Sequence, residues 1–548
     1  MRCLTNLLML SFVCASAFGQ DSPASTSAPT ATDLSRYEEL GASIGAVSVI
    51  VDNIFDTSKP EEDKRIYRLA NRMHIETRPH VIENIVLVRP GDPFEQRVLE
   101  ESARLLRTNI FISEATVRAV RYDPVRNTVD VEVRVRDSWS FTPDISFGRH
   151  GGFNEYGVTL DESNLLGRGK ELILSRDVAI ERNSKFVQYV DRNLLGSRGR
   201  LDAMFGDNSD GHRYRLELTR PFYALDSRWS VGSEIIGEER VDPIYDLGEI
   251  VDEFGRDYDL FELYGGWSRG LVDGRATRWM IGATSDKHVF SPSSDVPSPL
   301  LLPPDRELVY PWVGMQIVVD DFRELTQLST MGRVEDAALG LNLNVRLGYA
   351  ARRYGADRDA VIFSLGASKG WQSGEGRFLF LDLESQARRE DEGVRNAVFR
   401  TNLRYFHRNF GQKHLFMASF QAVASDKLDA DQQILLGGDS GLRGYPLRYQ
   451  TGEHSALLSV EQRFFTNWFP WRLFQVGGAV FFDVGRVWGQ DPRGEPVLGT
   501  LSDVGFGLRL ASPRAGSRQM IHVDLAFPLN RSDSIDAVQL LIESKTAF

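Results

Sequence analysis

The sequence predicts a mainly β protein: a transmembrane antiparallel β-barrel of about 16 strands, preceded by one small α/β domain. Two observations lead to this fold class. From Ser140 to Phe548 the chain is made of short segments in which apolar and polar residues alternate, separated by clusters of Gly, Asp, Asn, Pro and Ser. After the N-terminal segment there is no run of about 18 apolar residues that could form a transmembrane helix.

The strand count follows from the length of the alternating region. Its 409 residues, divided by about 25 residues per strand and connection, give about 16 strands. The alternation is clear in residues 213–219, 478–488 and 520–527. One apolar and one polar face suit a barrel in lipid, although a soluble β-sandwich produces the same pattern. An export signal, the lack of cysteine beyond it and the final Phe548 favour the membrane barrel.

Residues 1–19 have the features of a signal peptide: Arg2, an apolar stretch over residues 4–14, and small residues before a cleavage point. Both cysteines of the chain, Cys3 and Cys14, lie in this segment. The exported protein would therefore have no disulfide, thiol nucleophile or cysteine metal site. Residues 20–39, which begin rich in Ser, Thr, Ala and Pro, are expected to form a disordered linker.

Residues 40–137 predict a compact α/β domain. We expect a strand over residues 47–55, a short helix over 78–88, a second helix, and then strands over 115–122 and 128–136. The second helix is expected to begin with Asp92 as its cap, Pro93 in the first helical position and Glu95 completing a capping box. The barrel is expected to occupy residues 138–548. Within it, the tetrapeptide Asn-Leu-Leu-Gly occurs at 164–167 and again at 193–196, which indicates two turns of similar geometry.

Composition argues against several classes of function. The net charge is -12, and it becomes more negative once Arg2 is removed with the signal, so nucleic acid is not an expected partner. The nine histidines show no metal-binding spacing. Residues 438–441 read Gly-Asp-Ser-Gly, but no histidine motif accompanies them, so a glycine-rich loop is the simpler interpretation. We expect no enzyme activity and no cofactor.

Two motifs carry a resemblance to a known family. Residues 437–446 read Gly-Gly-Asp-Ser-Gly-Leu-Arg-Gly-Tyr-Pro, and residues 481–488 read Phe-Phe-Asp-Val-Gly-Arg-Val-Trp, with Phe482, Gly485 and Trp488 at its recurring positions. Gly-Phe-Gly-Leu-Arg at 505–509 and an alternating strand at 521–528 follow. In this order they resemble the C-terminal half of the BamA/TamA superfamily of outer-membrane barrels, the bacterial surface antigens. The domain at 40–137 resembles a single POTRA domain of that family.

The resemblance implies a loop that folds into the barrel lumen with Arg443, Gly444 and Tyr445 at its tip. Arg443 would pair with Asp483 and with Glu461 on the inner wall. The alternation permits this, because both acids point inward if Phe482 and Val460 face lipid. Arginine suits the position, since its planar fork of donors can hold two carboxylates at once. Phe548 fits a C-terminal sorting signal, and Trp488, with residues 468–471, suits an interfacial aromatic girdle.

The resemblance also implies a function: the assembly, insertion or translocation of proteins at the outer membrane of a Gram-negative-type bacterium, with the POTRA-like domain in the periplasm. Expected partners are outer-membrane lipid and unfolded outer-membrane or secreted clients. Periplasmic chaperones or an inner-membrane protein are further candidates. Two alternatives stay open: a two-partner-type translocator dedicated to one secreted protein, and a passive pore or structural barrel.

Overall fold

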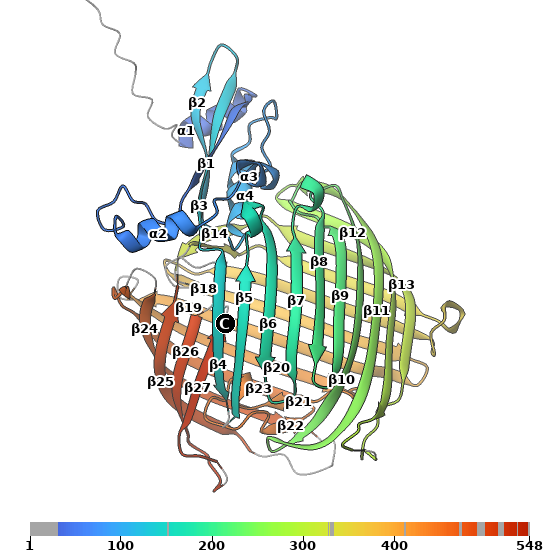
Figure 1. Cartoon of the computed structure of the whole chain (residues 1–548). Helices are drawn as coiled ribbons and strands as arrows, with labels where there is room; N and C mark the ends of the chain where they lie inside the picture. Colours follow the sequence, from blue (N-terminus) through green and yellow to red (C-terminus); the bar gives the residue numbers. More distant parts are fainter. Residues whose placement is uncertain are drawn as a thin grey trace, which may run out of the picture.

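The structure is a computed structural model that consists of a large β-barrel with a small α/β module at one end (Figure 1). It describes residues 31–150, 153–296, 298–326, 328, 334–409, 413–470, 474–489, 499–512, 520–533 and 535–545. The expected signal peptide and Phe548 lie outside these residues. No helix in the described part of the chain is long and apolar enough to cross a membrane.

The barrel is closed and contains 20 described strands. Each strand pairs antiparallel with its neighbour in the chain, skipping only two small hairpins, and β27 lies beside β4. The strands are β4 (Phe141–His150), β5 (Phe153–Glu162), β6 (Lys170–Val178), β7 (Asn183–Asp191), β8 (Arg200–Asn208), β9 (Gly211–Arg220), β10 (Trp229–Asp246), β11 (Glu249–Val272), β12 (Arg275–Pro292), β13 (Arg306–Val319), β16 (Asn342–Ala350), β17 (Ala360–Gln372), β18 (Arg377–Glu390), β19 (Gly393–Asn409), β20 (His414–Asp426), β23 (His454–Phe465), β24 (Gln475–Trp488), β25 (Leu501–Ala511), β26 (Met520–Pro528) and β27 (Gln539–Lys545).

The mainly β fold class is confirmed, but the expected count of about 16 strands is wrong. The first six strands, β4 to β9, are only 9 or 10 residues long and are joined by short turns. An average of about 25 residues per strand and connection is therefore too long for this side of the barrel.

Burial follows the alternation that the sequence predicted. On β24, Val480 and Phe482 are 48% and 38% exposed on the outer face, whereas Asp483 is fully buried inside. Three tryptophans, Trp229, Trp267 and Trp279, form one cross-strand row on the outer face of β10, β11 and β12. The row lies close to the module, and tryptophan is enriched where a barrel surface meets lipid headgroups. It therefore marks the membrane boundary at this end.

The module contains α1 (Ala31–Glu39), β1 (Ser43–Asp52), α2 (Arg65–Met73), α3 (Pro79–Ile85), α4 (Gln96–Arg107), β2 (Ile112–Asp123) and β3 (Thr128–Asp137). Its three strands form one sheet in the order β1-β3-β2, with β1 parallel to β3. The alternating valines of β3, Val129 to Val135, are at most 1% exposed beneath α3 and α4. The expected strands and helices are present, but α1 and α2 are additional.

Two expectations about the module are wrong. Residues 31–39 are not a disordered linker, because Tyr37 on α1 stacks on Tyr122 with ring centroids 4.4 Å apart and helps to cover the core. Helix α4 begins at Gln96, after Glu95, rather than at Pro93. Residues 92–94 pair instead with the start of β1 through backbone hydrogen bonds such as Phe94 N to Ala42 O, 2.9 Å.

Helix α4 docks the module on the rim of the barrel. Arg107 donates to both carboxylate oxygens of Asp336, at 2.8 and 2.6 Å, and to Glu324 at 2.8 Å. These acids belong to a hairpin, β14 (Phe322–Thr326) and β15 (Val334–Ala338), that leaves the barrel between β13 and β16. The guanidinium of Arg104 lies 3.8 Å from the ring centroid of Phe322. Ion pairs and a cation–π contact therefore hold this part of the module to the barrel.

The repeated Asn-Leu-Leu-Gly turns lie on the same rim. Both are short 3-10 turns, and their second leucines, Leu166 and Leu195, have nearly equal positive φ angles of 55° and 54°. The similar geometry expected from the sequence is confirmed. The first turn accepts a backbone hydrogen bond from Arg78 to Gly167 at 3.0 Å. Just after the second, Arg198 donates to Ile85 O and Val86 O, each at 2.7 Å.

We expect Arg107→Ala to weaken the docking of the module by roughly 2 kcal/mol, because it removes charge-assisted hydrogen bonds at a mostly buried site. Hydrogen exchange of the β14–β15 hairpin and of α4 should become faster, while the barrel strands stay protected. Arg118→Ala is the matched control, since Arg118 pairs with Glu132 inside the module and with no other acid in the described part of the chain. Equal exchange in both variants would mean that Arg107 does not hold the module.

Candidate functional site

The candidate site is the long connection between β20 and β23, which folds back into the barrel. It carries two very short strands, β21 (Ile434–Leu436) and β22 (Gln450–Gly452), which pair with each other, and a 3-10 turn at Gly438–Ser440. Figure 1 shows β21 and β22 at the end of the barrel away from the module. We call residues 427–453 the luminal loop.

The tip of the luminal loop is held by an arginine fork. Arg443 donates from Nε and Nη2 to the two oxygens of Asp483, at 2.7 and 3.0 Å, and from Nη1 to Glu461 at 3.0 Å. Its guanidinium also lies 3.3 Å from the ring centroid of Phe481. Arg443 is only 5% exposed. The structure thus brings together the three residues that the motifs had paired, and the bidentate geometry is the one that lysine could not reproduce.

The network is larger than the sequence indicated. Arg443 also donates to Asp524 on β26 at 3.2 Å, and Arg509 on β25 bridges Glu461 and Asp524. Arg463 donates to Glu461 at 2.7 Å. Three arginines therefore contact three carboxylates in a buried cluster. Period-two alternation could place Asp524 and Arg509 on the inner face, but it could not show that the register brings them to the height of Arg443.

The two residues after Arg443 fix the tip in different ways. A Cβ atom on Gly444 would lie 2.6 Å from Cβ of Asp503 and 3.0 Å from the backbone nitrogen of Pro528. Only glycine therefore lets the loop backbone lie this close to β25 and β26. The Tyr445 hydroxyl donates to Ser502 O at 2.9 Å. It also lies within hydrogen-bond distance of the backbone N–H groups of Ser502 and Asn530.

The opposite wall holds the base of the luminal loop with the charges reversed. Asp429 accepts two hydrogen bonds from Arg388 on β18, at 3.0 and 2.8 Å, and pairs with Arg306 on β13 at 3.0 Å. Asp431 also pairs with Arg306. The loop therefore crosses the lumen between an acidic wall and a basic wall, and each end presents the complementary charge.

The strand motif at 481–488 supports the loop from behind. A Cβ atom on Gly485 would lie 2.9 Å from Leu436 Cδ2, so glycine allows β21 to pack on the wall. Phe482 faces outward, as does Trp488 at 40% exposed, next to the ring of His454 at 5.7 Å. The Gly-Asp-Ser-Gly string forms the 3-10 turn, in which the Ser440 hydroxyl accepts a hydrogen bond from Gly437 N at 2.7 Å. It has the structure of a turn, as the sequence predicted.

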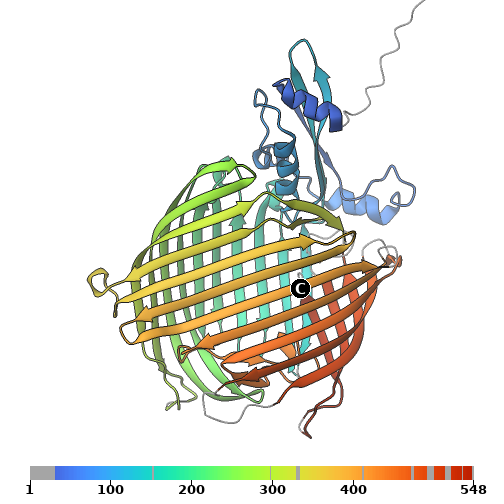
Figure 2. The ribbon, with the colours of Figure 1, turned by 180° about the vertical axis from the view of Figure 1, so that it is seen from behind.

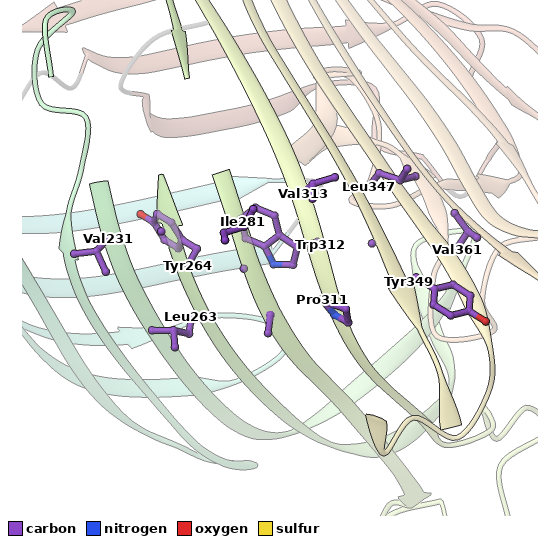
Figure 3. Close-up of a pocket in the computed structure, with 14 residues that line it drawn as sticks. Val231, Leu263, Tyr264, Ile281, Pro311, Trp312, Val313, Leu347, Tyr349 and Val361 are labelled. Atoms are coloured by element: carbon purple, nitrogen blue, oxygen red, sulfur yellow. The ribbon is translucent and has the colours of Figure 1, made fainter. Parts of the chain in front are cut away.

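Two other features bear on ligands. The described residues contain no group of His, Cys, Asp and Glu that could hold a metal ion. An apolar hollow lies between β10 and β17 (Figure 3), and the side chains of Ile281, Val313 and Leu347 in it are 67%, 57% and 49% exposed on the outer face of the barrel. A surface of this kind faces hydrocarbon in a membrane. It belongs to the barrel–lipid contact and not to the luminal site.

The fold and the luminal loop together define a class: a closed β-barrel whose lumen is crossed by an arginine-tipped loop. Residues 367–542, which contain both the loop and the strands that hold it, match the Omp85 superfamily domain. The resemblance to the BamA/TamA superfamily is thus confirmed over residues 367–542, which carry an Omp85 superfamily domain. A comparison with curated protein sequences finds no match.

Two solved structures are similar to this chain at low sequence identity. One is BamA from Haemophilus ducreyi lacking POTRA domains 1–3, with 12% identity and a TM-score of 0.42 over 91% of this chain and 84% of that chain. Another is CdiB from Acinetobacter baumannii, with 10% identity and a TM-score of 0.42 over 92% and 74% of the two chains. At this similarity the assignment rests on the domain match.

We expect Arg443→Ala to destabilise the folded barrel by about 3 to 5 kcal/mol, because it leaves the buried Asp483 carboxylate without its arginine partner. The exchange of charges in Arg443→Asp with Asp483→Arg should restore part of the loss. Both are measured as the midpoint of urea unfolding, followed by the heat-modifiable mobility of the barrel in gels. An unchanged midpoint for Arg443→Ala would contradict a structural role of the pair.

Gly444→Ala tests the close approach of the loop separately from charge. The added methyl group would overlap Asp503 and the backbone at Pro528, so we expect a loss of about 1 to 3 kcal/mol in barrel stability. Gly265→Ala is the control, because a Cβ atom there meets nothing within 4 Å. Equal unfolding midpoints for the two variants would show that the loop tip has room to move.

Proposed function

We propose that this barrel inserts client β-strand proteins into the outer membrane, and that the route is the seam between β27 and β4. The observation that carries the proposal is the place of this seam in the sheet. β27 and β4 are the last and first strands of the closed barrel, so no turn joins them, and Ile542 pairs with Arg149 at their junction. Figure 1 shows the two strands side by side at the front of the barrel.

A seam that opens between these two strands leaves backbone N–H and C=O groups on two strand edges. Such edges can pair with an incoming strand by β-augmentation. In hydrocarbon the gain from pairing is large, because unpaired backbone groups there find no water. A client strand that adds to β27 or β4 would therefore be templated directly in the membrane. The mechanism requires no bond to be made or broken and no cofactor.

The luminal loop supports a lateral route over a route through the lumen. Arg443 ties it to β23, β24 and β26, and Asp429 ties it to β13 and β18. A dedicated translocator for one secreted protein would have to release both attachments for each client. That second function is favoured only if the loop leaves the lumen during transport, which makes the two functions separable by experiment.

The module is proposed to collect clients in the periplasm as a single POTRA-like domain. Strand β2 is an edge of the sheet β1-β3-β2, so an extended client segment can add to it. The rim contacts of Arg107 and Arg198 keep this sheet next to the barrel. Periplasmic chaperones or an inner-membrane partner are candidates to deliver the client. A single module offers less surface for accessory proteins than an array of several would.

The seam is tested by a reversible crosslink. Cysteines at Ile542 and Arg149, which are register partners, should form a disulfide that stops insertion of a client barrel into proteoliposomes, and reductant should restore it. The control is a crosslink between β26 and β27 at Val523 and Ile542, which leaves the seam free. If the seam crosslink leaves insertion unchanged, the lateral route is wrong. If one secreted protein still crosses, dedicated translocation is supported instead.

A further inference from the structure

Helix α2 (Arg65–Met73) is an element that neither the expected domain nor the client-handling mechanism uses. It lies between β1 and α3, and one face of it packs on the module. On that face Tyr67 is 4% exposed and stacks on Phe55, with ring centroids 4.5 Å apart. Asn71 donates to Phe55 O at 2.8 Å. The helix is therefore fixed in place by one side.

A second face of α2 is apolar and uncovered. Ile66, Leu69 and Met73 are 58%, 52% and 66% exposed, and their i, i+3, i+7 spacing places them in one row. Ile75, just beyond the helix, is 53% exposed. Four large apolar side chains open to solvent within ten residues are unusual for the surface of a soluble module. They indicate a surface that something apolar covers.

A third face of α2 is basic. Arg65, Arg68 and Arg72 form a row beside the apolar one. Arg68 pairs with Asp63 at 3.3 Å, whereas Arg65 and Arg72 have no ion pair in the described part of the chain. An apolar row flanked by arginines is the pattern of helices that lie in a membrane surface, where the long side chains reach the phosphate groups.

The position of α2 supports a membrane as the covering surface. Tyr67 and its neighbours pack with Trp139, directly before β4. Two residues later Phe141, on β4, is 44% exposed on the outer face of the barrel. Figures 1 and 2 both show α2 beside the rim at the end of the C-terminal strands, on the module side. The apolar row is therefore close to the surface where the barrel already meets lipid.

We propose that α2 binds the periplasmic surface of the outer membrane, with its apolar row among the acyl chains and its arginines at the phosphates of anionic phospholipids. A lipid surface fits better than a protein. The helix is about 14 Å long, and one row of side chains on it covers far less than the roughly 1,000 Å² of a stable protein interface. The proposal depends on the barrel being in the membrane and not on which clients it handles.

The test uses the full-length protein in lipid nanodiscs, with a single cysteine carrying an environment-sensitive fluorophore. Beyond Cys3 and Cys14 the chain has no other cysteine. A label at Leu69 should shift to the blue and be quenched by lipids that carry a quencher on the acyl chain. A label at Val125 is the control, because this residue is 93% exposed but lies on the β2–β3 turn. It should stay in water and unquenched.

The arginine row is tested by changing the lipid and the protein together. Nanodiscs of phosphatidylethanolamine with phosphatidylglycerol should give stronger quenching at Leu69 than phosphatidylcholine alone. Replacing each arginine by glutamine should weaken the membrane-bound state about fivefold per residue. These positions are exposed, so folding should persist, as heat-modifiable mobility would verify. Equal signals from Leu69 and Val125 would overturn the proposal, as would photocrosslinking of Leu69 to a periplasmic protein in place of lipid quenching.

Discussion

The buried contact of Arg443 with Asp483 and Glu461 is the constraint on which the position of the luminal loop depends. A charge moved from water into a protein interior is costly unless a partner and hydrogen bonds compensate it. Glu461, Asp483 and Asp524 are each at most 1% exposed on the wall. Arg463 and Arg509 on the wall donate hydrogen bonds to Glu461 and Asp524. Asp483, in contrast, accepts two hydrogen bonds from Arg443 on the loop. Asp483 therefore accepts these two hydrogen bonds only when the luminal loop lies inside the barrel.

The same reasoning links the loop to the shape of the barrel. The loop tip requires glycine at 444, where it lies close to β25, and the wall requires glycine at 485 on β24, where β21 packs against it. Asp429 and Asp431 fix the base of the loop to arginines on the far wall. The luminal loop is held at both walls and spans the lumen between them. Its removal would leave unpaired charges on each wall. The loop and the strands on which it rests are expected to fold as one unit.

The sequence predicted correctly those features that depend on neighbouring residues in the chain or on a short motif. Alternation placed Asp483 inside and Phe482 outside, and the two motifs paired Arg443 with its acids. The predictions were incomplete or wrong for features that depend on contacts between residues far apart in the sequence. Asp524 joins Arg443 only through the register of β24, β25 and β26. Helix α1 is stabilised by Tyr122, and α4 begins late because residues 92–94 pair with β1. The predicted strand count was wrong because strands β4 to β9 and the turns that join them are shorter than the assumed average.

The charge network also determines where the barrel could open. It joins the loop to Glu461 on β23, Asp483 on β24, Arg509 on β25 and Asp524 on β26. In the described part of the chain β27 contributes no residue to the contacts of Arg443, and beyond it lies β4, where the barrel closes. These four strands are joined to the luminal loop by the network and resist separation, since moving any one of them exposes buried charge. Opening between β27 and β4 would leave this charge network intact, and in the proposed mechanism a client strand pairs with the exposed edges. In that mechanism the loop contacts and the seam are complementary, because the strands held by the luminal loop direct the opening to the edge where a new strand can add.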